Sequence, residues 1–310
     1  MENQLLKSNL LNIIGCYVLL MFIFSHAMKA QNNVITFQVG SFAVTLLSEG
    51  QQQGRTNILI GATEEMLKQA VPDGTFPNAT NVFLVETGSK VFLFDAGLGP
   101  KTIENLELYG KKASDVDAVF ITHMHGDHIG SLLLNGEKGY PNATLYISKP
   151  EHDYYMSDET LSSLPENRRG SIMSTRNIIN AYKDKLNIFT PGEIENAPEL
   201  LPGVRGVAAY GHTPGHVGYL LESANGKIFM WGDLTHAMAI QMTFPEVAVS
   251  YDTDTAKAIE SRVKLLKYLS DNNLLVAGAH IQSPGIGRLS KSATTGYDFT
   301  FLCGCEGTTP

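Results

Sequence analysis

Five apolar, strand-like runs of this 310-residue chain each end in a histidine or an aspartate. Short apolar runs of this kind, bounded by turn residues, are typical of buried β-strands. A structural histidine can lie anywhere along a strand, so five such endings predict a rim where strand ends meet. The runs are "FLFD", "VFITH", "AAYGH", "FMWGD" and "LLVAGAH", and they end at Asp95, His123, His212, Asp233 and His280.

The second of these runs leads into "HMHGDH", which places His123, His125, Asp127 and His128 within six positions. Imidazole nitrogens and carboxylate oxygens are ligands of zinc and similar divalent metals. Four such residues on one short turn cannot easily surround a single ion, but they suit two ions side by side. A lone histidine is more often a core residue, whereas this cluster with distant partners predicts a metal site.

The rest of the chain alternates strand signals with helix signals, twice over. Strand-like runs open each half, and residues 50–80 between two of them are expected to be loop. Residues 151–185 are expected to be helical with a break at "SLPENRRGS". Residues 255–270 carry an amphipathic helix pattern, for which Asp254 is a suitable N-cap. These patterns predict one α/β domain of two packed sheets with helices outside, over residues 31–310.

Residues 1–30 have the layout of a secretory signal peptide. Lys7 precedes an apolar run from Leu10 to Phe24, which is shorter than the ~20 residues that a membrane span needs. Cleavage after Ala27 or Ala30 is expected, with an uncleaved anchor as the alternative. We therefore expect an exported protein, periplasmic or secreted, with no stable membrane anchor.

Charge argues against a nucleic-acid partner. Without Lys7, Lys29 and Glu2 of the leader, the chain keeps 21 basic and 30 acidic residues, a net charge of −9. Phosphate backbones are bound by clusters of Lys and Arg, and no basic cluster here exceeds two in a row. Only Cys303 and Cys305 remain after the leader, and their redox state stays open.

With these residues in view, the sequence resembles the metallo-β-lactamase superfamily, whose mark is HxHxDH after a buried strand. The other markers follow in order along nearly the whole mature chain: Asp95 in "FDAG", His216 in "GHTPGH", Asp233 in "WGDLTH" and His280 in "GAH". The resemblance implies a four-layer αββα sandwich with a dinuclear metal site at the edge of the sheets.

The resemblance also implies roles for the individual residues. One ion is expected to have His123, His125 and His216 as ligands; the other Asp127, His128 and His280; and Asp233 bridges them. It assigns His212 to a supporting or structural role and Asp95 to orienting a ligand. His236 is left open between contacting the substrate and supporting a ligand.

Two divalent ions sharing one water would lower its pKa and polarise the attacked group, so the resemblance implies hydrolysis without a covalent intermediate. Asp127 is the expected catalytic residue, passing the proton to the leaving group. Zn²⁺ is the first choice of metal, although Co, Mn and Fe suit the same ligands.

Two branches of the superfamily remain as candidates for the substrate. The stretch "GDLTHAMAIQMTFPEVAVSYDTD" is similar to exported N-acyl-homoserine lactonases, which are quorum-quenching enzymes, and to phosphotriesterases of the methyl parathion hydrolase group. We favour the lactonase, acting on a small molecule with an acyl chain. A non-catalytic binding member of the fold is a further alternative, and homodimerisation is left open.

The acyl chain requires an apolar channel beside the metals, and a tyrosine often supports the substrate carbonyl in such enzymes. The channel candidates are Met124, Met238, Phe244, Ile281 and Ile286, and ordinary core packing is the alternative for each. The tyrosine candidates are Tyr154, Tyr155 and Tyr219.

Overall fold

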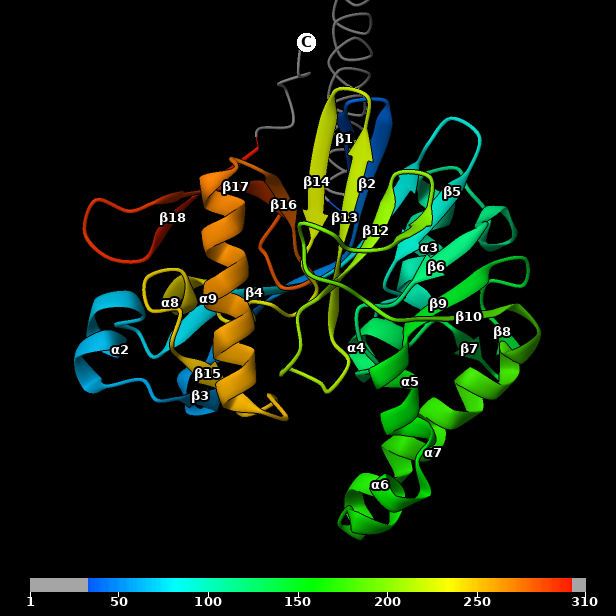
Figure 1. Ribbon diagram of the computed structural model, residues 1–310, viewed down its shortest axis with the longest axis horizontal. Helices are drawn as coiled ribbons and strands as arrows, with labels where there is room; N and C mark the ends of the chain where they lie inside the picture. Colours follow the sequence, from blue (N-terminus) through cyan, green and yellow to red (C-terminus); the bar gives the residue numbers. More distant parts are fainter. Residues whose placement is uncertain (1–32, 303–310) are drawn as a thin grey trace, which may run out of the picture.

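The computed structural model describes residues 33–302, and it contains two large sheets packed face to face (Figure 1). The leader 1–30, Cys303 and Cys305 lie outside the described residues. In the order in which they pair, the strands of the first sheet are β1 (Val34–Val39), β2 (Phe42–Arg55), β4 (Thr75–Glu86), β5 (Val91–Phe94), β6 (Ala118–Phe120), β9 (Thr144–Ser148) and β10 (Leu186–Phe189).

The second sheet comes entirely from the C-terminal half. Its strands in pairing order are β11 (Glu199–Leu201), β12 (Val204–Ala208), β13 (Val217–Ser223), β14 (Gly226–Met230), β16 (Leu275–Ala277), β17 (Ile286–Lys291) and β18 (Tyr297–Phe301). Two small ribbons pair β3 (Leu59–Ile60) with β15 (Ala248–Val249), and β7 (Leu133–Leu134) with β8 (Glu137–Lys138).

The helices lie mainly on the outer faces of the sheets. They are α2 (Glu64–Ala70), α3 (Pro100–Leu108), α4 (Gly126–Ile129), α5 (Lys149–Met156), α6 (Asp158–Ser163), α7 (Glu166–Ala181), α8 (Met238–Gln241) and α9 (Thr255–Asp271), with short 3₁₀ turns at η1 (Thr56–Ile58), η2 (Ala113–Asp115) and η3 (Lys183–Lys185). In Figure 1, α6 and α7 project beyond the body of the sandwich. No helix within residues 33–302 is long and apolar enough to cross a membrane.

Three apolar layers explain why the elements stack as they do. The central layer lies between the sheets, where Phe94 stacks on Phe120 and both meet Tyr219 of the second sheet edge-on. The outer face of the first sheet is covered by α3, α5 and α7, and that of the second by α9 through Leu265 and Leu269. The expected αββα architecture is confirmed.

The helix from residue 255 is also confirmed. α9 runs over Thr255–Asp271, and the Asp254 side chain caps it by accepting a hydrogen bond from the Lys257 amide. Because its apolar positions recur every three to four residues, one stripe of the helix is buried on the second sheet.

The expectation of loop over residues 50–80 is wrong. β2 continues to Arg55 and β4 begins at Thr75, and the two pair antiparallel along their whole length, with a bulge between Ser48 and Gly50. The polar run "QQQGR" is exposed on both faces, so it has no alternating apolar pattern to reveal the strand. This long ribbon carries Asn78 and Gln52 to the edge of the candidate site described below.

Candidate metal centre

The "HMHGDH" turn follows β6 and folds tightly at the edge of the first sheet. His123 and His125 lie in the loop, and the one-turn helix α4 begins at Gly126 and carries Asp127 and His128. His123 and His128 are buried, whereas the Asp127 side chain is 30% exposed. The turn therefore presents its polar atoms at different depths around one point.

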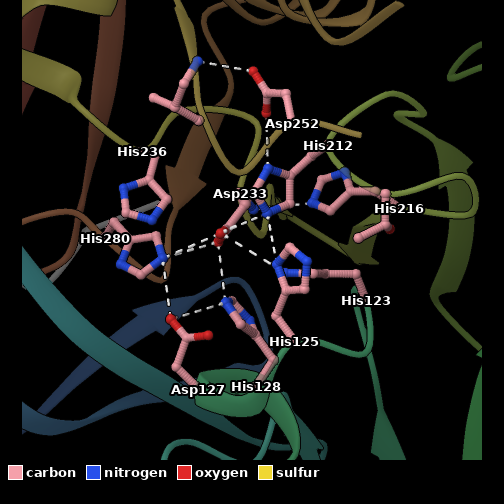
Figure 2. A network of polar contacts seen from close by, with 12 residues as sticks. His123, His125, Asp127, His128, His212, His216, Asp233, His236, Asp252 and His280 are labelled. Carbon is pink, nitrogen blue, oxygen red and sulfur yellow. Dashed lines mark hydrogen bonds and ion pairs between the residues drawn. The ribbon is translucent and has the colours of Figure 1, made fainter. Parts of the chain in front are cut away.

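Three further residues reach this point from the second sheet (Figure 2). Asp233 follows β14, His280 follows β16, and His212 lies in the loop between β12 and β13. β14 and β16 are parallel neighbours, so their carboxyl ends lie at the same edge of the sheet. The prediction that strand ends converge on one rim is confirmed.

The converging side chains form two overlapping groups. In the first, His123, His125, His212 and Asp233 each offer a ligand atom, and these atoms lie within 4.8 Å of one another. His212 Nε2 is 3.1 Å from both His125 Nδ1 and Asp233 Oδ2. Ligand atoms of a tetrahedral zinc site, with bonds of about 2.0–2.1 Å, are separated by roughly 3.3 Å.

Asp127, His128 and His280 form the second group. Asp127 Oδ2 lies 3.7 Å from His128 Nε2 and 3.6 Å from His280 Nε2. Asp233 stands between the groups, because its Oδ1 is 3.2 Å from both of these imidazole nitrogens while its Oδ2 faces His212. One carboxylate is thus shared by both groups, as a bridging ligand would be.

The buried polar atoms test whether this donor set fits two ions. Among the described residues, His123 Nε2, His128 Nε2 and Asp233 Oδ1 are buried without a hydrogen-bond partner. Leaving such atoms unpaired costs about 1–3 kcal/mol each, so native proteins almost always satisfy them. All three point into the cluster, and their chemistry is that of zinc ligands. The residues fit a pair of divalent ions.

His212, and not His216, occupies the position of the third histidine, which corrects the assignment made from the sequence. His216 Nδ1 lies 2.8 Å from the Ala209 carbonyl, and its Nε2 accepts a hydrogen bond of 2.9 Å from the Asp233 amide. Both ring nitrogens are therefore used by the backbone, and His216 anchors the Asp233 loop instead of facing the cluster.

His128 and His280 are each oriented through their second ring nitrogen. His128 Nδ1 lies 2.8 Å from Asp95 Oδ2, and His280 Nδ1 lies 2.8 Å from the Ala79 carbonyl. Asp95 also accepts from the amide and hydroxyl of Thr122, the residue before His123. Asp95 has a positive φ of 61°, a conformation that non-glycine residues usually adopt only where surrounding structure holds it.

Asp252 orients His212 in the same way, through the second ring nitrogen. The sequence alone did not reveal this role. Its Oδ1 lies 2.8 Å from His212 Nδ1, and its side chain is fully buried. The buried Arg262 of α9 lies 3.7 Å from Asp252 and donates to the carbonyls of Leu234 and Val247. Asp252 stands 40 residues beyond His212 in a segment without strand or helix, so no pattern links the two.

His236 lies at the rim of the cluster. Its ring stacks on that of His280 with 4.0 Å between centroids. The Asn78 side-chain amide donates a hydrogen bond of 2.9 Å to the His236 backbone carbonyl. With Asp233 and His280 it forms a further group within 4.8 Å. Burial, followed by the charge of His280, lowers the pKa of His236 to about 3, so the ring is neutral at pH 7.

Burial and charge act on the cluster in opposite directions. Burial alone would raise the pKa of Asp233, but the surrounding imidazoles of His280, His128 and others outweigh it and hold that pKa well below the usual range. Burial lowers the pKa of His125 to about 3. At His128, His212 and His280 burial is outweighed by the charge of Asp233, which raises the pKa of all three rings, that of His212 to about 9. Metal ions bind the neutral imidazoles, so they would displace protons from these rings.

Two cavities that share part of their lining lie beside the cluster. The inner cavity, of about 520 Å³, is lined by Asp127, His212, Asp233 and His280. The side cavity, of about 500 Å³, shares His125, Arg168 and Tyr251 with it. The further lining of the side cavity includes Met124, Ile129, Tyr154, Tyr155, Leu164 and Ile172.

The cavities show which of the residues expected to line the acyl-chain channel actually line a cavity. Of the five apolar residues expected in the channel, Met124 alone lines a described cavity, whereas Met238, Phe244, Ile281 and Ile286 pack into apolar clusters. Tyr154 and Tyr155 line the side cavity, but Tyr219 is buried between the sheets and donates to the Ile121 carbonyl. Tyr251, 49% exposed and lining both cavities, was missed.

Solved structures with this architecture align over most of the chain. The hydrolase AbOPH, of the β-lactamase superfamily, is 25% identical with a TM-score of 0.80, and the match covers 87% of this chain and 98% of AbOPH. AidC, a dizinc quorum-quenching lactonase solved with an N-hexanoyl-L-homoserine product, is 26% identical with a TM-score of 0.76 and the same coverage.

Among curated proteins, the anti-Pycsar protein Apyc1 of Paenibacillus sp. (strain J14) is 29% identical over 157 residues, which is 50% of this chain and 60% of Apyc1. The chain spans about 60% of the length of this relative. The profile of the metallo-β-lactamase superfamily matches residues 75–280, a span that runs from the start of β4 to His280. The chain belongs to the metallo-β-lactamase superfamily.

Proposed function

We propose that this protein is a dinuclear metal-dependent hydrolase that opens the lactone ring of N-acyl-homoserine lactones. The observation that carries the proposal is the side cavity, because it reaches the His125 turn and its lining combines apolar and aromatic side chains with polar ones such as Arg168 and Thr175. An acyl chain gains about 0.8 kcal/mol for each methylene that it buries in such a lining. AidC, which resembles this chain over 87% of its length, was solved with an acyl-homoserine product.

In the proposed site, His123, His125 and His212 hold one ion, Asp127, His128 and His280 hold the other, and Asp233 is shared. We propose Zn²⁺ for both positions, by the match of imidazole and carboxylate ligands. Such ions, when bound, lower the pKa of water and polarise a carbonyl oxygen.

The residues of this chain would orient the substrate and move the proton. Asp127 is the proposed proton carrier, since its carboxylate is 30% exposed at the inner cavity whereas Asp233 is 3% exposed. Tyr154, Tyr155 and Tyr251 line the side cavity, and they are the proposed donors to the acyl amide or the lactone carbonyl. His236 borders the inner cavity with a neutral ring that can exchange hydrogen bonds with the substrate.

The experiment compares kcat/KM for a long-chain acyl-homoserine lactone with kcat/KM for a phosphotriester such as paraoxon. The lactone is expected to be the better substrate by at least about tenfold. A phosphotriester preferred by orders of magnitude would instead assign the chain to the second candidate, the phosphotriesterase. A chain that binds less than about one metal per molecule, with an activity that a chelator does not reduce, would contradict both.

We further propose that the protein is exported, on the layout of residues 1–30. Expression of the full chain in a Gram-negative host, followed by fractionation and N-terminal sequencing, tests this. A mature N-terminus after Ala27 or Ala30 in the periplasm or medium is expected. An intact leader on cytoplasmic protein would contradict it.

A further inference from the structure

A buried carboxylate lies behind the metal cluster without contacting the ligand atoms. Glu151 stands in the first turn of α5, and it is 1% exposed. Its Oε1 accepts a hydrogen bond of 2.8 Å from the Met124 amide. Its Oε2 accepts a hydrogen bond of 2.7 Å from the Thr213 hydroxyl and one of 2.9 Å from the Gly215 amide. Three donors thus converge on one side chain.

These donors belong to two loops that carry ligands. Met124 stands between His123 and His125, in the loop after β6 of the first sheet. Thr213 directly follows His212, in the loop between β12 and β13 of the second sheet. Glu151 therefore joins, through one carboxylate, the loops that deliver three histidines of the first group from opposite halves of the sandwich.

The contact between α5 and the second loop is close as well as polar. A Cβ at Gly215 would lie 2.0 Å from the Glu151 backbone nitrogen, so only glycine fits there. The Ser148 hydroxyl, which caps α5, donates a hydrogen bond of 2.6 Å to the Gly215 carbonyl. The start of α5 and residues 213–215 consequently form one packed unit.

We propose that Glu151 is a positioning residue that sets the distance between His212 and the His123–His125 pair, and thereby the affinity of the first ion. This rests on the proposed dinuclear function. The second group has separate supports, because Asp95 orients His128 and the Ala79 carbonyl orients His280. Loss of Glu151 is therefore expected to weaken one ion and spare the other.

Glutamine cannot replace this carboxylate. Glu151 accepts on both oxygens, whereas the amide of Gln has one acceptor oxygen and a nitrogen that only donates. In Glu151→Gln the amide nitrogen must face either the Met124 amide or the Thr213 and Gly215 donors, and one loop is then repelled. The change keeps the volume of the side chain, so packing is preserved.

The matched control is Glu49→Gln. Glu49 accepts from a backbone amide, that of Leu98, and from a threonine hydroxyl, that of Thr102, but it contacts neither ligand loop joined by Glu151. Any general effect of removing a carboxylate that accepts these two kinds of donor appears in this variant as well. Thr213→Val, which removes one donor and keeps the side-chain shape, serves as a second, milder variant if Glu151→Gln does not fold.

The experiment measures stepwise Zn²⁺ affinities by competition with a chromogenic chelator, the visible spectrum of the Co²⁺-loaded protein, and the unfolding temperature of the metal-free protein. Wild type and Glu49→Gln are expected to bind two ions alike. Glu151→Gln is expected to lose about 10–100-fold in affinity for one ion only, with a changed Co²⁺ spectrum. Thr213→Val should show a smaller loss at the same ion.

Three results would overturn the proposal: unchanged affinities with a less stable metal-free protein, an equal loss at both ions, or the same loss in Glu49→Gln. The first would make Glu151 a purely structural residue. A wild-type chain that binds no metal would instead overturn the proposed function itself, and the inference with it.

Discussion

His212 Nε2 lies 3.1 Å from His125 Nδ1, although 87 residues separate the two in the chain and they come from different sheets. Both nitrogens face the Asp233 carboxylate. Burial opposes it, but the charge of this carboxylate raises the pKa of His212 to about 9, so the site favours a positive charge between these groups. A shared cation explains why two lone pairs should converge there, since each nitrogen is then a ligand.

Replacing each histidine of "GHTPGH" in turn tests this relationship. His212→Ala removes a ligand, so we expect kcat/KM to fall by more than about 100-fold, beyond the range usual for residues that only support ligands. His216→Gln should keep both metals, because the His216 ring bonds to Ala209 and Asp233 backbone atoms. Metal analysis of both purified variants checks the assignment. Loss of metal from His216→Gln with metal retained in His212→Ala would reverse it.

Asp252 should matter for catalysis although it lies behind the cluster. Asp252→Asn removes the charge that fixes the His212 tautomer and leaves Arg262 without its carboxylate partner. We expect kcat/KM to drop about 10–100-fold, with lower metal affinity. Asp254→Asn is the control, because Asp254 caps α9 at the surface two residues away. Similar activity losses in both variants would show that the effect is not specific to His212.

The sequence predicted the parts of the fold and site that show as a periodic apolar pattern or as a polar residue at the end of a strand. The αββα layers follow from apolar runs, and the rim at Asp95, His123, Asp233 and His280 follows because parallel strands end at one edge. The apolar parts of β2 and β4 were predicted, but the extension of β2 was missed because Gln51–Gln53 are exposed and show no alternation.

The choice between His212 and His216 could not be made from spacing, because both lie in the same turn. It depends on backbone direction: Gly211 has a φ of 121°, and the chain then turns so that His216 meets the backbone at Ala209 and Asp233. The roles of Asp252 and Glu151 could not be predicted from the sequence for a related reason. Their partners, His212 and Met124, are 40 and 27 residues away, and only the packed fold brings them together.

Metal removal should destabilise the protein. Without ions, His123 Nε2, His128 Nε2 and Asp233 Oδ1 are buried without a hydrogen-bond partner. Ions that bind only the folded state at 100 times their Kd contribute about 2.7 kcal/mol. We expect the unfolding temperature of wild type to fall on adding a chelator and to recover with excess Zn²⁺. Asp233→Asn, which lacks the shared carboxylate, should respond far less. A wild-type unfolding temperature unaffected by chelator would contradict the dinuclear site.

Filling the side cavity should change the preference for chain length. Leu164 lines this cavity between α6 and α7, and Leu164→Trp is expected to displace about two methylenes of a long acyl chain. At about 0.8 kcal/mol per methylene, KM for a dodecanoyl lactone should rise about tenfold, while KM for a butanoyl lactone stays unchanged. Leu108→Trp, on an exposed leucine of α3, is the control. An equal rise for both substrates would place the acyl chain elsewhere.

The stability of the metal-free protein should depend on pH through His216. Burial, followed by the charge of His212, lowers the pKa of His216 from 6.5 to about 3. Below pH 6.5 this histidine is protonated in the unfolded chain but stays neutral in the folded chain. The free energy of unfolding therefore falls as the pH falls from 6.5 towards 3. Each pH unit in this window costs up to about 1.4 kcal/mol. His216→Gln has no such proton, so its free energy of unfolding, measured by urea titration from pH 7 to pH 5, should fall less steeply than that of wild type. Equal slopes in the two proteins would show that the His216 ring is not held neutral between the Ala209 carbonyl and the Asp233 amide.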